Sequence, residues 1–277
     1  MKLNFIKVNP TENMTVFVLD QIPRSMYMDI ATKIMDYSNV YAEQVGFLEN
    51  ISSEDSEACV RVHMMGGEFC GNAARALAAI LVQRKHCKIQ REESKFIVPL
   101  EVSGTNEIIN CEVEHNDINS FISTAKMPLH KSIKDISIEY KDTVHKGTLV
   151  EFPGIVHLIV NSQGIDEKED FFEIIKEKFN DLNYDALGIM FFNEENSYME
   201  PLVYVKLTES LIWERGCGSG TAALGIVFSH RLKKSIDMVV KQPGGQLEIF
   251  TDWNENKINS IYLKGVVNIV AEGIAYI

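Results

Sequence analysis

The sequence reads CGNAARALA at residues 70–78 and CGSGTAALG at residues 217–225. Both stretches start with Cys-Gly and a small polar residue, and continue with the apolar, Ala- and Leu-rich pattern of a buried helix. They begin 147 residues apart in a chain of 277, which is about half of its length. A repeat at this spacing predicts a duplicated chain, whose two halves are related by a pseudo-twofold axis and place the Cys-Gly segments on opposite sides of one cleft.

The rest of the chain combines a few helical patterns with many strand patterns. Short runs of β-branched and aromatic residues, such as Val60–Met64 and Phe96–Val102, are typical of strands. Helical periodicity is found in four segments: Ser25–Tyr37, Asn72–Arg84, Lys168–Phe179 and Gly220–Arg231. We therefore predict an α+β fold of two sheet-rich halves, with the change between them at Lys126–Pro128.

The composition is that of an ordinary globular protein with an acidic surface. Hydrophobic residues make up 45% of the chain and charged residues 24%, and the formal net charge is −12. An acidic chain without a long basic run disfavours nucleic acid and anionic membranes as partners. The N-terminal segment lacks the apolar core of a signal peptide, and no stretch approaches the ~20 apolar residues of a membrane span. We therefore expect a cytoplasmic protein.

Five cysteines, an odd number, are scattered along the chain without a Cys-x-x-Cys pair. This spacing predicts neither a disulfide framework nor a structural zinc site, and the seven histidines show no metal-binding spacing. Cys59, Cys87 and Cys111 lack the repeated context and are predicted to be small buried apolar residues. Cys70 and Cys217 are the exceptions, and we expect them to act as free thiols.

The position of Cys70 and Cys217 directly before a predicted helix indicates their chemistry. The positive end of a helix dipole lowers a thiol pKa because it favours the thiolate, and its N–H groups bind anions such as a carboxylate. Two opposed thiols are suited to racemisation at an α-carbon, because one thiolate removes the proton while the other thiol delivers a proton to the opposite face. This chemistry needs no pyridoxal phosphate and no metal, so we predict no cofactor.

These motifs resemble those of the diaminopimelate epimerase family, and the resemblance extends along nearly the whole chain. Besides the two Cys-Gly segments it includes five others: Glu12–Thr15, Gly154–His157, Glu214–Gly216, Pro243–Gly245 and Gly265–Ile274. The resemblance implies two pseudo-symmetric diaminopimelate-epimerase-like domains, each a barrel-like β-sheet around a central helix. The implied N-terminal domain is residues 1–127, completed by a final strand at about 266–277, and the C-terminal domain is residues 128–265. A homodimer is also implied.

The detailed pattern is closer to the histidine racemases of staphylopine-type metallophore pathways. Their motifs match six segments of this chain: Asn9–Thr15, Glu43–Phe47, Glu68–Ala73, Ser210–Glu214, Cys217–Ala222 and Gln242–Gly245. This resemblance implies reversible racemisation of L- and D-histidine, with Cys70 and Cys217 as the acid–base pair.

The same resemblance implies a set of substrate-contacting residues around the two cysteines: Asn13, Glu43, Gly71, Asn72, His157, Glu214, Gly218 and Ser219. Four of them also have a purely structural interpretation. Asn72 could cap a helix, and Glu43 could be a solvated strand residue. Glu214 could form a surface salt bridge, and His157 could be a core histidine with satisfied hydrogen bonds.

Two differences argue against diaminopimelate itself as the substrate. The asparagines that hold its distal end in the epimerases correspond here to Ile155 and Gly188, so the distal carboxylate would be buried without a partner. Three alternatives to a histidine racemase stay open. They are an epimerase for diaminopimelate or lanthionine, a phenazine-type isomerase that does not use cysteine, and a noncatalytic thiol switch in which Cys70 and Cys217 pair on oxidation.

Overall fold

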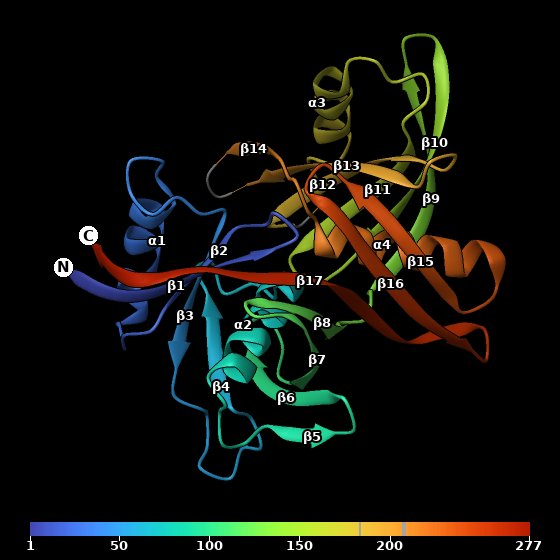
Figure 1. Cartoon of the computed structure of the whole chain (residues 1–277). Coiled ribbons are helices and arrows are strands. Elements are labelled where there is room, and N and C mark those ends of the chain that lie inside the picture. The colour runs from blue at the N-terminus through green and yellow to red at the C-terminus, as the bar shows by residue number, and fades with distance from the viewer. Residues whose placement is uncertain (183, 207–208) are drawn as a thin grey trace. The chain divides into compact units, whose positions relative to one another are not determined.

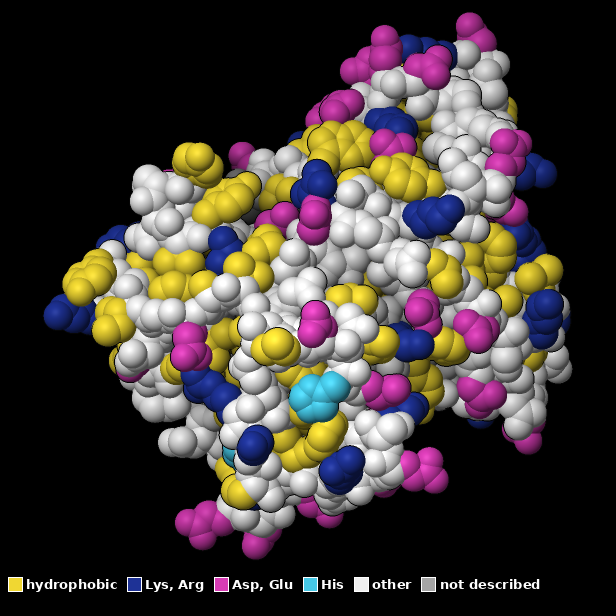
Figure 2. All heavy atoms as spheres, in the orientation of Figure 1, with side chains coloured by type: hydrophobic (Ala, Val, Ile, Leu, Met, Phe, Trp, Pro, Cys, Tyr) yellow, Lys and Arg dark blue, Asp and Glu magenta, His cyan; other side chains and the backbone are white. Residues whose placement is uncertain are grey.

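The computed structural model describes residues 1–182, 184–206 and 209–277 of the chain. The chain forms two compact units (Figure 1): Met1–Met127 together with Tyr262–Ile277, and Pro128–Ile261. None of the helices in the described ranges combines the length and the apolar character that a membrane span requires. On the face drawn in Figure 2, Lys and Arg side chains are interspersed with Asp and Glu side chains.

The first unit is a mixed sheet with two α-helices and one 3-10 helix. Its helices are η1 (Arg24–Met26), α1 (Tyr27–Met35) and α2 (Gly71–Gln83). Its strands are β1 (Lys2–Pro10), β2 (Thr15–Val18), β3 (Gln44–Glu49), β4 (Val60–Met64), β5 (Gln90–Glu92), β6 (Lys95–Val102), β7 (Ile108–Asp117), β8 (Ser120–Met127) and most of β17 (Lys257–Tyr276). Strand β1 pairs antiparallel with β17 and β2, and the pairs β2–β3 and β4–β6 are parallel.

Strand β2 shows that this sheet is covered on both faces. All four of its residues are buried. Val16 and Val18 pack in a cluster with Ile30 and Ile34 of α1, whereas Phe17 belongs to the cluster around α2. Because successive side chains of a strand point to opposite faces, the run Thr-Val-Phe-Val serves two cores at once.

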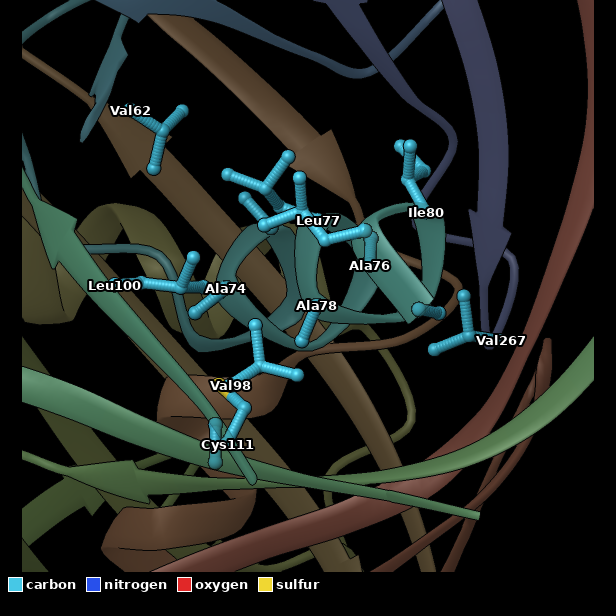
Figure 3. Close-up of a cluster of buried hydrophobic side chains, with 14 of the residues drawn as sticks. Val62, Ala74, Ala76, Leu77, Ala78, Ile80, Val98, Leu100, Cys111 and Val267 are labelled. Carbon is cyan, nitrogen blue, oxygen red and sulfur yellow. The ribbon is translucent and has the colours of Figure 1, made fainter. Parts of the chain in front are cut away.

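Helix α2 is the centre of the larger core of this unit. Its sequence, GNAARALAAILVQ, is buried from Gly71 to Val82. Alanine combines high helix propensity with a short side chain, so strands can approach the helix closely on several sides. Figure 3 shows Leu77 of α2 in the cluster that includes Val98 and Leu100 of β6. A helix that is buried on all sides is held in place by its packing, and this fixes the position of the residue at its start.

The described part of the second unit is also a mixed sheet with two α-helices. Its helices are α3 (Lys168–Lys178) and α4 (Gly218–Leu232). Its strands are β9 (Ser132–Tyr140), β10 (Thr143–Glu151), β11 (Ile155–Asn161), β12 (Ala186–Asn193), β13 (Tyr198–Val205), β14 (Ser210–Trp213), β15 (Ile236–Gln242), β16 (Gly245–Asn254) and the beginning of β17. Aromatic side chains of α3 and the neighbouring strands, among them Phe171, Phe172 and Phe191, fill its core.

The two units share the order and pairing of their core elements. In the first unit, β1 is antiparallel to β2, β2 is parallel to β3 across α1, β3 is antiparallel to β4, and β4 is parallel to β6 across α2. The second unit repeats these pairings: β10 is antiparallel to β11, β11 is parallel to β12 across α3, β12 is antiparallel to β13, and β13 is parallel to β15 across α4. Each parallel pair is connected through a helix, because the chain must return to the end where it started before it can run in the same direction again.

The α+β class predicted from the sequence is confirmed as a sheet-rich fold with few helices. The four predicted helices correspond to α1, α2, α3 and α4, and their ends agree within two residues. The sequence patterns do not predict the β9–β10 hairpin. The predicted burial is wrong for Cys87, which lies exposed in the turn region after α2, whereas Cys59 and Cys111 are buried.

Candidate active site

Cys70 is the residue from which α2 begins. It is the N-cap, its backbone is extended (φ −128°, ψ 109°), and its Sγ accepts a hydrogen bond from the Ala73 N–H at 3.4 Å. The next position has no room for a side chain, because a Cβ on Gly71 would lie 2.4 Å from Met127 Sδ. The sulfur therefore lies at the positive end of the helix dipole, as the sequence predicts.

The turn before Cys70 is held by the loop that follows β6. The buried Ser103 hydroxyl accepts a hydrogen bond from the Met64 N–H (2.9 Å) and donates one to the Glu68 carbonyl (2.7 Å). Gly104 has a positive φ of 78°, and a Cβ there would lie 2.3 Å from the Phe69 nitrogen. Only glycine allows this close approach, so the chain reaches Cys70 along a fixed path.

Three of the predicted substrate-contacting residues of the first unit form one hydrogen-bonded chain. Asn72 Nδ2 donates to Asn13 Oδ1 (3.2 Å), and Asn13 Nδ2 donates to Glu43 Oε2 (3.1 Å). Both asparagines are 3% exposed, and Glu43 is partly buried in the segment just before β3. The fold thus brings a carboxylate and two amides from three distant segments to the start of α2.

Cys217 caps α4 with the same geometry. Its backbone is extended (φ −99°, ψ 107°), and its Sγ accepts a hydrogen bond from the Gly220 N–H at 3.3 Å. A Cβ on Gly220 would lie 2.1 Å from Met190 Sδ and 3.1 Å from the Cys217 sulfur. The repeated Cys-Gly pattern therefore encodes one local structure twice, a sulfur that accepts the N–H of the residue three positions later.

Gln242, at the end of β15, holds the start of α4. The Cys217 N–H donates to Gln242 Oε1 (2.7 Å), and Gln242 Nε2 donates to Thr221 Oγ1 (2.8 Å). Thr221 Oγ1 in turn donates to the Cys217 carbonyl (2.6 Å). The Gly244 N–H donates to the Arg215 carbonyl (2.7 Å) and ties the preceding loop to the same turn. These bonds fix the Cys217 backbone from two elements.

His157 contacts this half of the site through a serine. It lies on β11, is fully buried, and its Nε2 is 2.9 Å from Ser219 Oγ. Ser219 Oγ is in turn 3.6 Å from Cys217 Sγ. Burial lowers the pKa of His157 to about 3, so the ring is neutral at neutral pH. The three side chains form a line in which a neutral imidazole orients a hydroxyl beside the sulfur.

The environment of Cys217 opposes thiolate formation. The residue is 3% exposed, and burial, followed by the charge of Glu214 and a hydrogen bond with its side chain, raises the pKa of the thiol well above its usual value. The Gly220 N–H and the Ser219 hydroxyl lower the pKa but are outweighed. The low thiol pKa expected from the helix dipole is therefore wrong for Cys217, which is a thiol at neutral pH.

Within each unit the structure groups the predicted residues around its cysteine. Asn13, Glu43, Gly71 and Asn72 lie at the start of α2, and His157, Glu214, Gly218 and Ser219 lie at the start of α4. Sequence reasoning misses Gln242 and the buried Arg75. Each could have been found from the sequence, because Gln242 belongs to a matched motif and Arg75 is the one charged residue in the α2 sequence.

The chain is similar over nearly its whole length to one protein family and to several curated proteins. Residues 2–276 match the family model described as the histidine racemase CntK N-terminal domain. A histidine racemase of Fusobacterium nucleatum subsp. nucleatum is 37% identical, and the match covers 99% of this chain and 97% of that protein. A histidine racemase of Staphylococcus aureus is 30% identical, and the match covers 99% and 98% of the two chains.

Solved structures with the same fold include other racemases and epimerases. A probable proline racemase from Agrobacterium radiobacter gives a TM-score of 0.69 at 12% identity, over 99% of this chain and 92% of that chain. A hydroxyproline epimerase from Agrobacterium vitis gives 0.68 at 11% identity, with the same two coverages. At such low identity the likeness concerns the fold alone. The fold of this chain is similar to that of proline racemase-like epimerases.

Proposed function

The chain belongs to the histidine racemase family, and from this premise we propose that it interconverts L- and D-histidine without a cofactor, with Cys70 and Cys217 as the acid–base pair. The observation that carries the mechanism is the shared geometry of the two cysteines. Each caps a buried helix, and each sulfur accepts the N–H of the third helical residue. Two residues of this chemistry at matched positions are what a two-base reaction requires.

In the proposed reaction one thiolate removes the α-proton of histidine and the other thiol delivers a proton to the opposite face. The Cα–H bond breaks as an S–H bond forms on the first cysteine. The second S–H bond then breaks as the new Cα–H bond forms, so the negative charge passes from one sulfur to the other. The N–H groups of the helix starts bind the substrate carboxylate and stabilise the charge that develops on it.

The surroundings of the two sulfurs suit a division of roles in the resting enzyme. Burial and Glu214 hold Cys217 as a thiol at neutral pH, which is the state required of the proton donor. Cys70, which is partly exposed, then acts as the thiolate base. After one turnover the roles are exchanged, as a reversible racemase requires.

The remaining predicted residues are proposed to bind histidine. In the first unit, Asn13, Glu43, Gly71 and Asn72 supply two amides, a carboxylate and a helix N-terminus for the ammonium, carboxylate or imidazole groups. In the second unit, Glu214, Gly218 and Ser219 bind near the reacting carbon, and His157 contributes by orienting Ser219. The hydrogen-bonded chain from Asn72 to Glu43 supports a shared role for the first group.

The test is proton NMR of the reduced protein with L-histidine in deuterated water, with lysine and diaminopimelate as comparison substrates. We expect loss of the histidine α-proton signal together with loss of optical rotation. Exchange on diaminopimelate alone would instead assign the chain to epimerase activity. Absence of exchange on histidine would contradict the proposal.

Replacement of either cysteine tests the two-base mechanism. We expect Cys70→Ser and Cys217→Ser each to reduce net racemisation by at least about a thousandfold, because each removes one partner of the acid–base pair. Optical rotation of L-histidine and of D-histidine measures the loss. Cys87→Ser, at an exposed cysteine, is the matched control and should keep full activity. Full activity in either active-site variant would overturn the mechanism.

We further propose that the two units are duplicated domains, each a sheet wrapped around its cysteine-capped helix. The repeated order of strands and helices supports this finer description. The proposed boundaries are residues 1–127 with about 266–277, and 128–265. Limited proteolysis tests the first boundary, which lies in the segment between β8 and β9 where cleavage should concentrate, whereas the second lies within β17.

A homodimer in the reducing cytoplasm completes the proposal. Both sulfurs must stay reduced for catalysis, which requires a reducing compartment. Apolar side chains repeat on the exposed side of β17 at Val266 (40% exposed), Val270 (52%) and Ile274 (53%), a pattern suited to contact with a second copy. Light scattering should give about twice the chain mass of 31.3 kDa; a monomer would contradict the dimer alone.

A further inference from the structure

Arg75 carries a charge into the core of the first unit. It lies on α2, its side chain is fully buried, and it is among the largest fully buried side chains of the protein. Within the described residues, its Nε and Nη1 atoms have no hydrogen-bond partner, and Nη2 donates to Asn72 Oδ1 at 2.7 Å. A buried cation with so few partners costs stability, which indicates that this position serves something other than packing.

The hydrogen bond from Arg75 to Asn72 sets the direction of a longer chain. A guanidinium can only donate hydrogen bonds, so Asn72 must present its oxygen to Arg75 and its amide nitrogen to Asn13. Asn13 accepts that bond with its oxygen and therefore presents its own amide nitrogen to Glu43. Turning either amide round would place donor against donor. The buried cation thus specifies which atoms of both amides face which neighbour, as far as the Glu43 carboxylate.

Arg75 lies on the helix that Cys70 caps, and it also interacts electrostatically with two cysteines. Its charge interacts with the thiol groups of Cys70 and Cys111. Cys111 is fully buried and burial raises its pKa to about 12, so it stays a neutral thiol. Burial lowers the pKa of Arg75 to about 10, which leaves the guanidinium protonated at neutral pH. Cys70 is then the sulfur whose negative charge Arg75 favours, since opposite charges stabilise each other reciprocally.

We propose that Arg75 is a positioning residue of the racemase, whose buried guanidinium orients Asn72, Asn13 and Glu43 and supplies the counter-charge of the Cys70 thiolate. The proposal rests on the proposed function, because it gives Cys70 and Glu43 their roles. It extends the site inward from the residues that touch substrate to a charge in the core beneath them.

The test compares Arg75→Met, which removes charge and donors, with Arg75→Lys, which keeps a cation and a donor. The first readout is the rate of iodoacetamide alkylation of Cys70 at neutral pH without substrate, measured by peptide mass spectrometry. We expect Arg75→Met to slow this rate by about tenfold, since loss of one nearby opposite charge reduces the thiolate fraction by that order. Arg75→Lys should restore most of it. Arg84→Met, at a 45% exposed arginine following α2, is the control and should react like the wild type.

The second readout is the kinetics of histidine racemisation. We expect Arg75→Met to raise KM, because Glu43 and the two amides lose their fixed orientation, and to lower kcat, because less Cys70 is thiolate. Arg75→Gln, which is neutral but polar, replaces Arg75→Met if circular dichroism shows that the latter is unfolded. An unchanged Cys70 alkylation rate in the folded neutral variant would overturn the proposal. If the wild type does not racemise histidine, the proposed function fails, and the alkylation rates still decide the role of Arg75.

Discussion

At the scale of single residues, the two sulfurs differ in their surroundings although both cap a helix. Cys70 is partly exposed and interacts with the charge of Arg75, whereas Cys217 is buried and interacts with the carboxylate of Glu214. A cation favours a thiolate, and an anion favours a thiol. In the proposed mechanism, the charge next to each sulfur, and not the shared helix cap, therefore distinguishes base from acid in the resting enzyme.

The role of Glu214 gives a prediction about Cys217. Replacement by Gln removes the negative charge that raises the pKa of the Cys217 thiol, so the pKa should fall. We expect alkylation of Cys217 by iodoacetamide to begin at lower pH in Glu214→Gln than in the wild type, as followed by peptide mass spectrometry. Glu173→Gln, at a 67% exposed position on α3, should leave the profile unchanged. An identical profile in both variants would show that burial alone controls this thiol.

Residue types and motifs predict which polar groups form the site, but they do not predict the pKa values of those groups. Asn13, Glu43 and Asn72 are recognisable from motifs, and they lie together in the structure. The raised pKa of Cys217 could not be predicted, because it depends on burial by segments distant in sequence. Arg75 looks like an ordinary helix residue until α2 is known to be buried on all sides.

At the scale of elements, the register of two parallel strands sets the position of His157. Strand β11 pairs with β12 so that His157 lies beside Gly188. A Cβ on Gly188 would lie 2.3 Å from His157 Nδ1 and 2.8 Å from Met190 Cε. The glycine therefore makes the space that the imidazole fills while its other nitrogen meets Ser219. This position could not carry a side chain here without moving His157.

The prediction at this scale is that Gly188→Ala damages both stability and catalysis. The added methyl group must displace the buried ring and weaken its bond to Ser219, at a cost of about 1–3 kcal/mol for overpacking. Urea unfolding measures the loss of stability, and optical rotation measures the expected fall in kcat. Gly273→Ala on β17 is the control, because its Cβ would meet nothing nearer than 3.6 Å. Equal behaviour of the two variants would contradict the assigned role of Gly188.

The elements that sequence patterns predict are those with strong local signals. Helices α2 and α4 combine a Cys-Gly start with an apolar run, and the sequence pattern predicts both to within two residues at each end. The β9–β10 hairpin lacks such a signal. Its two-residue turn consists of Lys141 and Asp142, both with positive φ (45° and 60°), where Asn-Gly is the usual sequence. The sheet context, and not the turn sequence, selects that conformation.

At the scale of the whole molecule, the two units share an order of core strands and helices that reaches beyond the two nine-residue segments in which their sequences are alike. The pairings β2–β3 and β11–β12 are parallel, as are β4–β6 and β13–β15. The sequence repeat is visible only at the cysteines because packing and chemistry restrict the residue type there. Elsewhere many different sequences can form the same strand, so the shared topology is not visible as a repeat in the sequence.

The last prediction concerns the stability of the whole protein in acid. Burial lowers the pKa of His157 from 6.5 to about 3, so below 6.5 the unfolded chain binds a proton that the folded protein excludes. The free energy of unfolding should therefore fall as the pH falls, by about 2 kcal/mol from this group between neutral pH and about pH 5. His157→Asn, which cannot titrate, should show a shallower decline in urea unfolding over that range. His115→Asn, at an exposed histidine, should decline like the wild type. A slope unchanged by His157→Asn would mean that the folded protein admits the proton, and that the imidazole beside Ser219 is not held neutral.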